Sequence, residues 1–339
     1  MKHEISIAFQ TNKTASEYVA LAKQVNEYDF DAVSVYCDLP FHTPYPPLML
    51  MAPHIERARI GVAAIASSRI HPLDIASQTA LLAEIARGGV YVGVARGAWL
   101  EEHGIHEQQP AIQAIRETVE IVRYMLSGKT GGYNGQVYTL AQHVHAPYTL
   151  PDYSVPILIG SWGRKLCALA GEIADEVKVG GSTNPDLVPV IQSYIAVGER
   201  AAKRPQGEVR VVMGAVSVLD EDRNLARHAA KRAVALYLPV VAPLDSTVKV
   251  EPELMERIRL HNQRDEKDQA AALISDDLLE RFAFAGNPDD LINHALRLFE
   301  AGAGRVEFGT PHGLNLHTGI QLLGEKVLPV VRQQLQSGQ

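Results

Sequence analysis

The sequence is poor in cysteine and in long apolar runs. Only two cysteines, Cys37 and Cys167, occur among 339 residues, too few for a disulfide framework and typical of a reducing compartment. No run approaches the roughly 18 uninterrupted apolar residues of a membrane span, and residues 1–6 lack the apolar core of a signal peptide. We therefore expect a cytoplasmic protein that does not bind membranes.

Clustered positive charge is also missing. The formal net charge is −7, and no block of basic residues stands out, so we expect neither nucleic acid nor an anionic membrane as a partner. Thirteen histidines are present, but His103-x-x-His106 and His143-x-His145 lack cysteine or carboxylate partners in a recognised zinc spacing. We expect no metal site, and a small-molecule substrate as the main partner.

What the chain does contain is an alternation of strand and helix patterns. Strands are expected at 4–9, 31–36, 59–66, from 90, 156–160, 176–179, 209–219 and 305–308. Helical spacing is found at 16–28, 48–52, 73–87, 112–126, 164–173, 186–203, from 220, from 276 up to a break at 286–288, at 289–301 and at 320–335. Such alternation favours parallel pairing, and eight units close a (β/α)8 barrel. A doubly wound open sheet is the alternative, but no glycine-rich dinucleotide fingerprint follows the first strand.

Two segments interrupt this alternation. Residues 127–155 contain Asn134-Gly135, a strong signal for a hairpin turn. Residues 238–275 are charged and carry no clear period, so we expect an irregular excursion. We interpret residues 1–339 as one barrel domain with two excursions, which would cover the barrel mouth and shape a substrate pocket.

The expected functional residues follow the strands, where barrels and open sheets place their sites. After the fourth strand comes Arg96-Gly97-Ala98-Trp99, and after the fifth comes Gly160-Ser161-Trp162-Gly163. Small residues at a strand-to-helix turn let backbone N–H groups approach an anion, and the following helix adds its positive end. The two loops are therefore candidates to hold a cofactor phosphate, although each could also be an empty tight turn.

Larger side chains in these loops have two interpretations each. Arg96 could pair with a phosphate or carboxylate of the cofactor, or form a salt bridge at the barrel mouth with Glu101, Glu102 or Asp38. Trp99 and Trp162 could form walls for a flat ring, or pack between helix and barrel.

Three residues near the end of the second strand complete the candidate site. Asp38 could accept a hydrogen bond from the cofactor or substrate and handle protons, or cap a loop. His42 lies in a proline-rich loop and is a candidate acid on the substrate side. Cys37 lacks an evident histidine partner, so we interpret it as a packing residue.

Several of these turns resemble those of the bacterial luciferase-like superfamily of flavin and deazaflavin enzymes. The resemblance is carried by Gly93–Leu100 (GVARGAWL), by Leu169–Asp175 (LAGEIAD), and by Gly286–Asp290 followed by Glu300–Gly304. It implies a TIM barrel with the ring cofactor in its mouth. It also implies a bulge with a non-prolyl cis peptide near Ala63-Ala64-Ile65, which places Ala63 and Ala64 beside the cofactor.

Within the superfamily the chain is most similar to coenzyme F420-dependent reductases such as methylenetetrahydromethanopterin reductase. That likeness implies hydride transfer between F420 and a small organic substrate, and a homodimer by analogy. An FMN-dependent monooxygenase is the first alternative. A non-catalytic cofactor-binding barrel is the second, because Ala8, Leu39 and Ala98 stand where relatives carry ionisable side chains.

Overall fold

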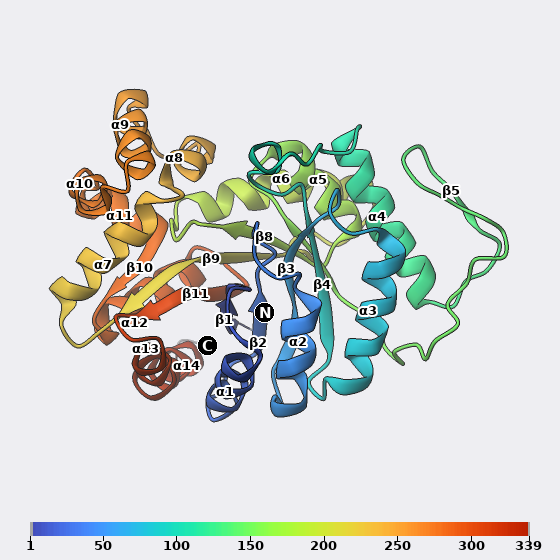
Figure 1. Cartoon of the computed structure of the whole chain (residues 1–339), viewed down its shortest axis with the longest axis horizontal. Coiled ribbons are helices and arrows are strands. Elements are labelled where there is room, and N and C mark those ends of the chain that lie inside the picture. Colours follow the sequence, from blue (N-terminus) through green and yellow to red (C-terminus); the bar gives the residue numbers. More distant parts are fainter. Residues whose placement is uncertain (1–2, 338–339) are drawn as a thin grey trace.

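Eight parallel strands form a closed barrel in the computed structural model, which describes residues 3–337 (Figure 1). Around the barrel they run β11-β1-β2-β3-β4-β7-β8-β9, and β9 returns to β11. The predicted (β/α)8 barrel is confirmed. The strand bounds are β1 Glu4–Phe9, β2 Ala32–Val35, β3 Arg59–Ala66, β4 Val90–Ala95, β7 Ile157–Gly160, β8 Glu176–Gly180, β9 Arg210–Leu219 and β11 Arg305–Gly313.

Helices between the strands cover the outside of the barrel (Figure 1). Their ends follow local chemistry: Thr14 and Glu17 form a capping box on α1, and Asn287 and Asp290 form another on α12. The bounds are α1 Ala15–Asn26, α2 Tyr45–Met51, α3 Pro72–Ile85, α4 Ala111–Leu126, α5 Arg164–Ile173, α6 Leu187–Ala201, α7 Arg223–Ala235, α12 Pro288–Glu300, α13 Leu316–Leu322 and α14 Leu328–Ser337. None of the helices within residues 3–337 is both long and apolar enough to cross a membrane.

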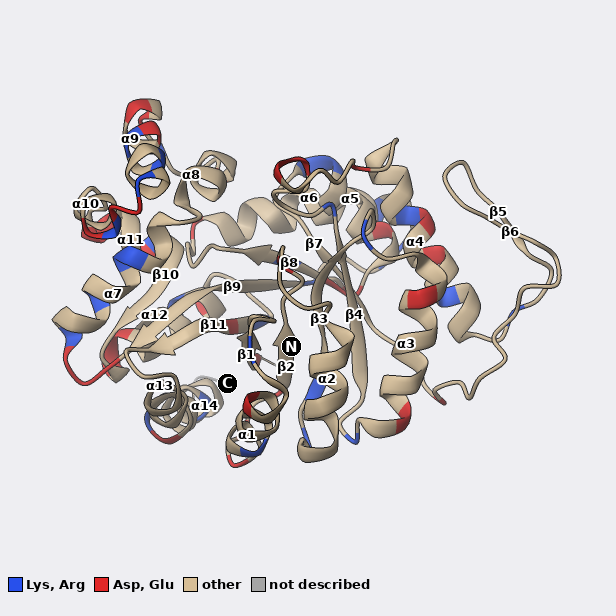
Figure 2. Ribbon diagram, viewed as in Figure 1, with Lys and Arg blue, Asp and Glu red and all other residues tan. Residues whose placement is uncertain are grey.

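The first excursion contains the hairpin that Asn134-Gly135 predicts. Strands β5 Tyr133–Asn134 and β6 Thr139–Leu140 pair antiparallel. The buried carboxylate of Glu117 on α4 accepts hydrogen bonds from the backbone N–H groups of residues 136, 137 and 138, at 2.7, 2.9 and 2.8 Å. One side chain of the barrel's helical layer therefore anchors the turn of an otherwise nearly uncharged arm (Figure 2).

The second excursion differs from its prediction, because residues 238–275 are largely helical and not irregular. They form α8 Leu238–Val241, α9 Pro252–Gln263 and α10 Lys267–Ala272, and α11 Asp276–Phe282 follows. Pro239 and Pro252 stand in the first turns of α8 and α9, where a missing N–H costs nothing. The prolines therefore divide the segment into short helices, which blurs any single helical period.

A ninth parallel strand, β10 Ala283–Gly286, was not predicted. It pairs with β9 from Val216 to Leu219, beyond the point where β8 stops pairing with β9 at Gly214. The long strand β9 thus has two successive neighbours on one edge. The four residues of β10 directly follow α11, so no turn signal separates them from the helix.

Candidate functional site

The loops after β4 and β7 begin side by side at one rim of the barrel. In the parallel register of these strands, Val94 lies opposite Ile159 and Ala95 lies opposite Gly160. Residues 96–99 and 160–163 therefore leave the sheet as neighbours, as the sequence analysis expects of a shared binding face. That they bind a cofactor remains a prediction.

The two loops lead into different elements. After β4 the chain forms a short 3-10 turn, η2 Glu101–His103, and α4 begins only at Ala111. The first loop thus lacks the directly following helix that the sequence analysis expected. Gly163, in contrast, is the N-cap residue of α5, and a Cβ built on it would meet nothing within 4 Å. The helix N-terminus at this rim therefore comes from the second loop alone.

Gly97 has a backbone conformation that suits glycine. Its φ is +96°, and a Cβ added there would lie 2.7 Å from the Cβ of Ala66 on β3. Both the left-handed conformation and the close approach to β3 require the missing side chain. Gly97 and Ala98 are exposed, so the backbone of this turn is open to a ligand.

Arg96 forms a salt bridge, but with a partner that the sequence analysis did not name. Its Nε and Nη2 donate to the two carboxylate oxygens of Glu107, at 2.6 and 2.7 Å. The predicted partners Glu101, Glu102 and Asp38 are not the ones used. Because Nε and Nη2 are engaged, an anionic cofactor group would have to displace Glu107 to use this edge of the guanidinium, or bind through its remaining N–H donors.

The two tryptophans occupy different environments. Trp99 is exposed and has a φ of 55°. Trp162 is half-buried against the core, and its Nε1 donates to the carbonyl of Gly180 at 3.1 Å. Trp162 thus packs against the core, as one interpretation expects, at the ends of β7 and β8, and its role as a wall for a ring remains a prediction.

Asp38 lies at the rim, just beyond β2. Its carboxylate accepts a hydrogen bond from Gln10 Nε2 at 3.3 Å. Burial raises the pKa of Asp38, while Gln10, Lys178 and Arg69 act in the opposite direction. Arg69 lies next to the preceding residue, with its Nη1 3.2 Å from Cys37 Sγ. A half-buried carboxyl with a raised pKa is suited to holding or releasing a proton.

His42 is exposed, and its backbone N–H donates to the carbonyl of Thr11 at 3.0 Å. This bond ties the loop after β2 to the segment after β1, at the same end of the barrel as Asp38. A role for the imidazole as an acid remains a prediction.

The bulge implied by the resemblance is present in β3. The peptide bond between Ala63 and Ala64 is cis, and the pairing of β3 with β4 shifts register between Val62 and Ile65. The shift turns the methyl group of Ala64 toward the barrel interior, where it packs with Leu158 and Tyr91. This confirms the expected bulge at the predicted residues.

The barrel interior holds charged residues that the sequence analysis did not propose as functional. Near the amino-terminal ends of the strands, which we call the lower end of the barrel, the carboxylate of Glu176 forms ion pairs with Arg59, Arg210 and Arg305. The N–O distances are 2.7, 2.6 and 2.9 Å. Higher up, Lys178 forms an ion pair with Glu307, and Glu307 also accepts from the hydroxyl of Ser34. The sequence did contain a signal for these inward charges, because charged and apolar residues alternate in β8 and β11. Alternate residues of a barrel strand point inward.

Six barrel strands carry a small residue at their uppermost inward position, whereas the end of β2 places the large ring of Tyr36 there. The small residues, which follow from strand alternation and, for Ala64, from the register shift in β3, are Ala8, Ala64, Ala95, Gly160, Gly180 and Gly309. A Cβ on Gly180 would meet nothing within 4 Å, so open space adjoins the end of β8. Small side chains around a mouth with open space leave room for a flat ring, and binding of an anionic cofactor arm by the adjacent loops at 96–99 and 160–163 remains a prediction.

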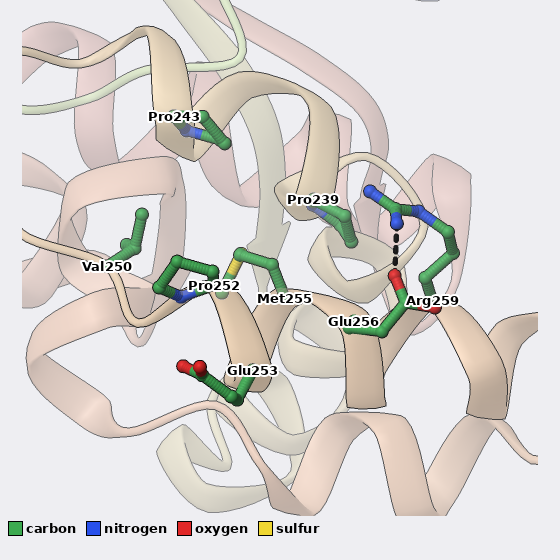
Figure 3. A pocket seen from close by; sticks show the side chains of 8 residues that line it. All are labelled: Pro239, Pro243, Val250, Pro252, Glu253, Met255, Glu256 and Arg259. Carbon is green, nitrogen blue, oxygen red and sulfur yellow. Dashed lines mark hydrogen bonds and ion pairs between the residues drawn. The ribbon is translucent and has the colours of Figure 1, made fainter.

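Two pockets differ in their relation to this mouth. One of about 310 Å³ is lined by Arg96, Gly97, Trp99, Leu100, Glu101, Glu102 and Glu107, and so belongs to the first loop. The other, about 550 Å³, is lined only by residues between 239 and 259 (Figure 3). The second pocket lies wholly within the helical excursion and contains no residue from the end of a barrel strand, so we do not assign the cofactor to it.

Comparison with known proteins decides the family. The sequence profile of the luciferase-like monooxygenase family matches residues 2–305. The chain belongs to this family. The predicted family and the predicted enzyme class, an oxidoreductase, are thereby confirmed.

Named relatives include F420-dependent enzymes. The chain is 29% identical over 298 residues to 5,10-methylenetetrahydromethanopterin reductase of Archaeoglobus fulgidus, covering 85% of this chain and 87% of the relative. It is 25% identical to F420-dependent glucose-6-phosphate dehydrogenase of Microbacterium testaceum, covering 85% and 82%.

Solved structures share the fold. The F420-dependent tetrahydromethanopterin reductase of Methanopyrus kandleri matches with a TM-score of 0.88 at 24% identity, over 98% of this chain and 100% of that one. A type II Baeyer-Villiger monooxygenase of Pseudomonas putida, in complex with FMN, matches with a TM-score of 0.70 at 13% identity, over 97% and 99%. These likenesses show that the chain shares its fold with both enzymes.

Proposed function

We propose that this chain is an F420-dependent oxidoreductase that transfers a hydride between the deazaflavin and a small organic substrate. The observation that carries the proposal is the pairing of β4 with β7, which brings residues 96–99 and 160–163 to one rim beside a mouth lined by small residues. The names of the relatives favour F420 as the cofactor.

The chain's own residues supply binding and orientation. Backbone N–H groups of the two loops and the N-terminus of α5 suit the anionic arm of a cofactor. The small side chains leave room for the ring, while Trp99 and Trp162 flank the entrance. When bound, the deazaflavin would supply the redox chemistry.

Asp38 is the group we assign to proton handling. Burial raises its pKa, so the carboxyl holds its proton to a higher pH than an exposed aspartate does. His42 is the second candidate, on the exposed side of the same end of the barrel.

An FMN-dependent monooxygenase is the competing function, favoured by the name of the matching family and by the FMN complex among the solved neighbours. The test compares binding of F420 and FMN to the purified protein by ring fluorescence. It then measures turnover with reduced F420 without oxygen and with reduced FMN under oxygen, across a substrate panel. Tight F420 binding with oxygen-independent turnover supports the proposal, and oxygen-dependent product with FMN alone overturns it.

A further inference from the structure

Lys178 is a buried cation at the upper part of the barrel interior. Its Nζ pairs with Glu307 Oε1, and its side chain keeps 6% exposure where that of Glu307 keeps none. The ring of Tyr36, at the end of β2, lies over the ammonium with Nζ 4.7 Å from its centroid. An ammonium has three N–H donors, and within residues 3–337 Glu307 is its one hydrogen-bond partner. Lys178, the more exposed member of the pair, therefore has N–H donors left for a ligand.

Open space adjoins the lysine and not the glutamate. Gly180 follows Lys178 by two residues and so lies above it on the inner face of β8. A Cβ there would meet nothing within 4 Å. Gly309 holds the same relation to Glu307 on β11, but a Cβ there would clash with the hydroxyl of Tyr36. A ligand that enters the mouth can thus approach the ammonium along β8, beside the ring of Tyr36, whereas the hydroxyl of Tyr36 fills the corresponding position above Glu307 on β11.

The charges of the barrel interior leave a positive excess below the mouth. In the described barrel strands, Arg59, Lys178, Arg210 and Arg305 face Glu4, Glu176 and Glu307, connected by ion pairs. The field of Lys178 reaches the rim, where it counteracts the rise that burial causes in the pKa of Asp38. In a site with little water such a field acts with less screening than at the surface.

We propose that Lys178 is a cofactor-binding residue that contacts the ring system and stabilises negative charge on it, with Glu307 as a positioning residue that holds the ammonium below the mouth. The inference rests on the proposed function and deepens it, because it assigns a residue to the ring and not to the anionic arm. It predicts a preference for rings with an accessible anionic form, such as F420, whose ring hydroxyl can ionise.

The test uses four variants of the full chain: Lys178→Met, Glu307→Gln, the double variant, and Lys326→Met as a control at an exposed lysine of the π-helical turn Leu323–Val327. F420 affinity is measured by ring fluorescence at fixed pH, and the absorbance of the bound ring reports how much of it is anionic. Circular dichroism confirms folding. If Lys178→Met does not fold, the double variant, which has no unpaired buried charge, replaces it.

Substitutions of the two ion-pair residues should change the F420 dissociation constant in opposite directions. Removing a charge-assisted hydrogen bond by Lys178→Met should raise the dissociation constant about tenfold to 100-fold and lower the anionic fraction. Glu307→Gln leaves the ammonium uncompensated, so it should lower the dissociation constant by about fivefold and raise that fraction. Lys326→Met should match the wild type.

The outcomes separate this inference from the proposed function. If wild-type protein binds F420 but Lys178→Met binds equally well, or if both single variants weaken binding alike, the inference is overturned and the proposed function stands. If wild-type protein binds neither F420 nor FMN, the proposed function is overturned, and the inference with it.

Discussion

Arg96 and Glu107 are joined by two hydrogen bonds, Nε to Oε1 at 2.6 Å and Nη2 to Oε2 at 2.7 Å, across the loop that follows β4. The pair engages the guanidinium fork in the same two-pronged manner in which arginine binds phosphate or carboxylate ligands. An anionic cofactor arm at this loop therefore has a carboxylate of the protein as its competitor.

We predict that Glu107→Gln tightens F420 binding, because it frees the fork and removes a negative charge from the pocket around residues 96–107. Arg96→Gln should weaken binding by about fivefold, since the side chain is mostly exposed and screened by water. Calorimetric titration at low and high salt measures both. If both substitutions change the F420 affinity only slightly and by the same amount, Arg96 stabilises the loop and does not bind the ligand.

Gly97→Asp should weaken cofactor binding by about tenfold or more, because it adds a negative charge and a side chain where, in the proposed function, backbone N–H groups bind the anionic arm. The matched control is Gly104→Ala. Gly104 also has a left-handed φ, +71°, but a Cβ there meets nothing within 4 Å. The control should lose stability by roughly 1 kcal/mol and keep its affinity. Unchanged affinity of Gly97→Asp in calorimetry would remove this loop from the site.

Asp38→Asn should lower kcat while leaving F420 affinity nearly unchanged, since the amide keeps the size of the carboxyl but cannot exchange its proton. Burial raises the pKa of Asp38. If the protonated form is the active donor, the rate falls as pH rises through that raised pKa, and the variant lacks this fall. A pH–rate profile tests the assignment, with His42→Asn measured in parallel. A wild-type profile in Asp38→Asn would dismiss the proton role.

Glu117→Gln should destabilise the hairpin arm by about 1–3 kcal/mol, because up to three backbone N–H groups lose a charged acceptor. Burial alone would raise the pKa of Glu117, but the bonds from Gln113 and from the backbone of residues 136–138 lower it. A carboxyl with a lowered pKa in the folded state stabilises above its unfolded pKa, and this contribution is lost as pH falls through the folded value. Thermal unfolding from neutral to acidic pH measures the loss, which the variant should not show.

The sequence analysis predicted the repeated β/α units well and the excursions less well. Strands such as Arg59–Ala66 and helices such as Arg164–Ile173 have the predicted bounds, because their period is local and their ends carry turn residues. The segment 238–275 was misjudged because its prolines and charges divide it into short helices. Strand β10 was missed because its four residues show no pattern apart from their pairing with β9.

What the sequence alone determined is the set of strand ends and the chemistry next to them, namely Asp38 and the small residues within the loops 96–99 and 160–163. The bulge at Ala63-Ala64 was expected from the family resemblance. Only the tertiary structure decided which groups meet. Glu107 lies eleven residues from Arg96, and Lys178 lies 129 residues from Glu307. The path of the loop after β4 brings the first pair together and the closure of the barrel brings the second together, and no local period of the sequence encodes either. Pairing between distant residues depends on strand register and on the inward side of each strand, and these are properties of the folded sheet.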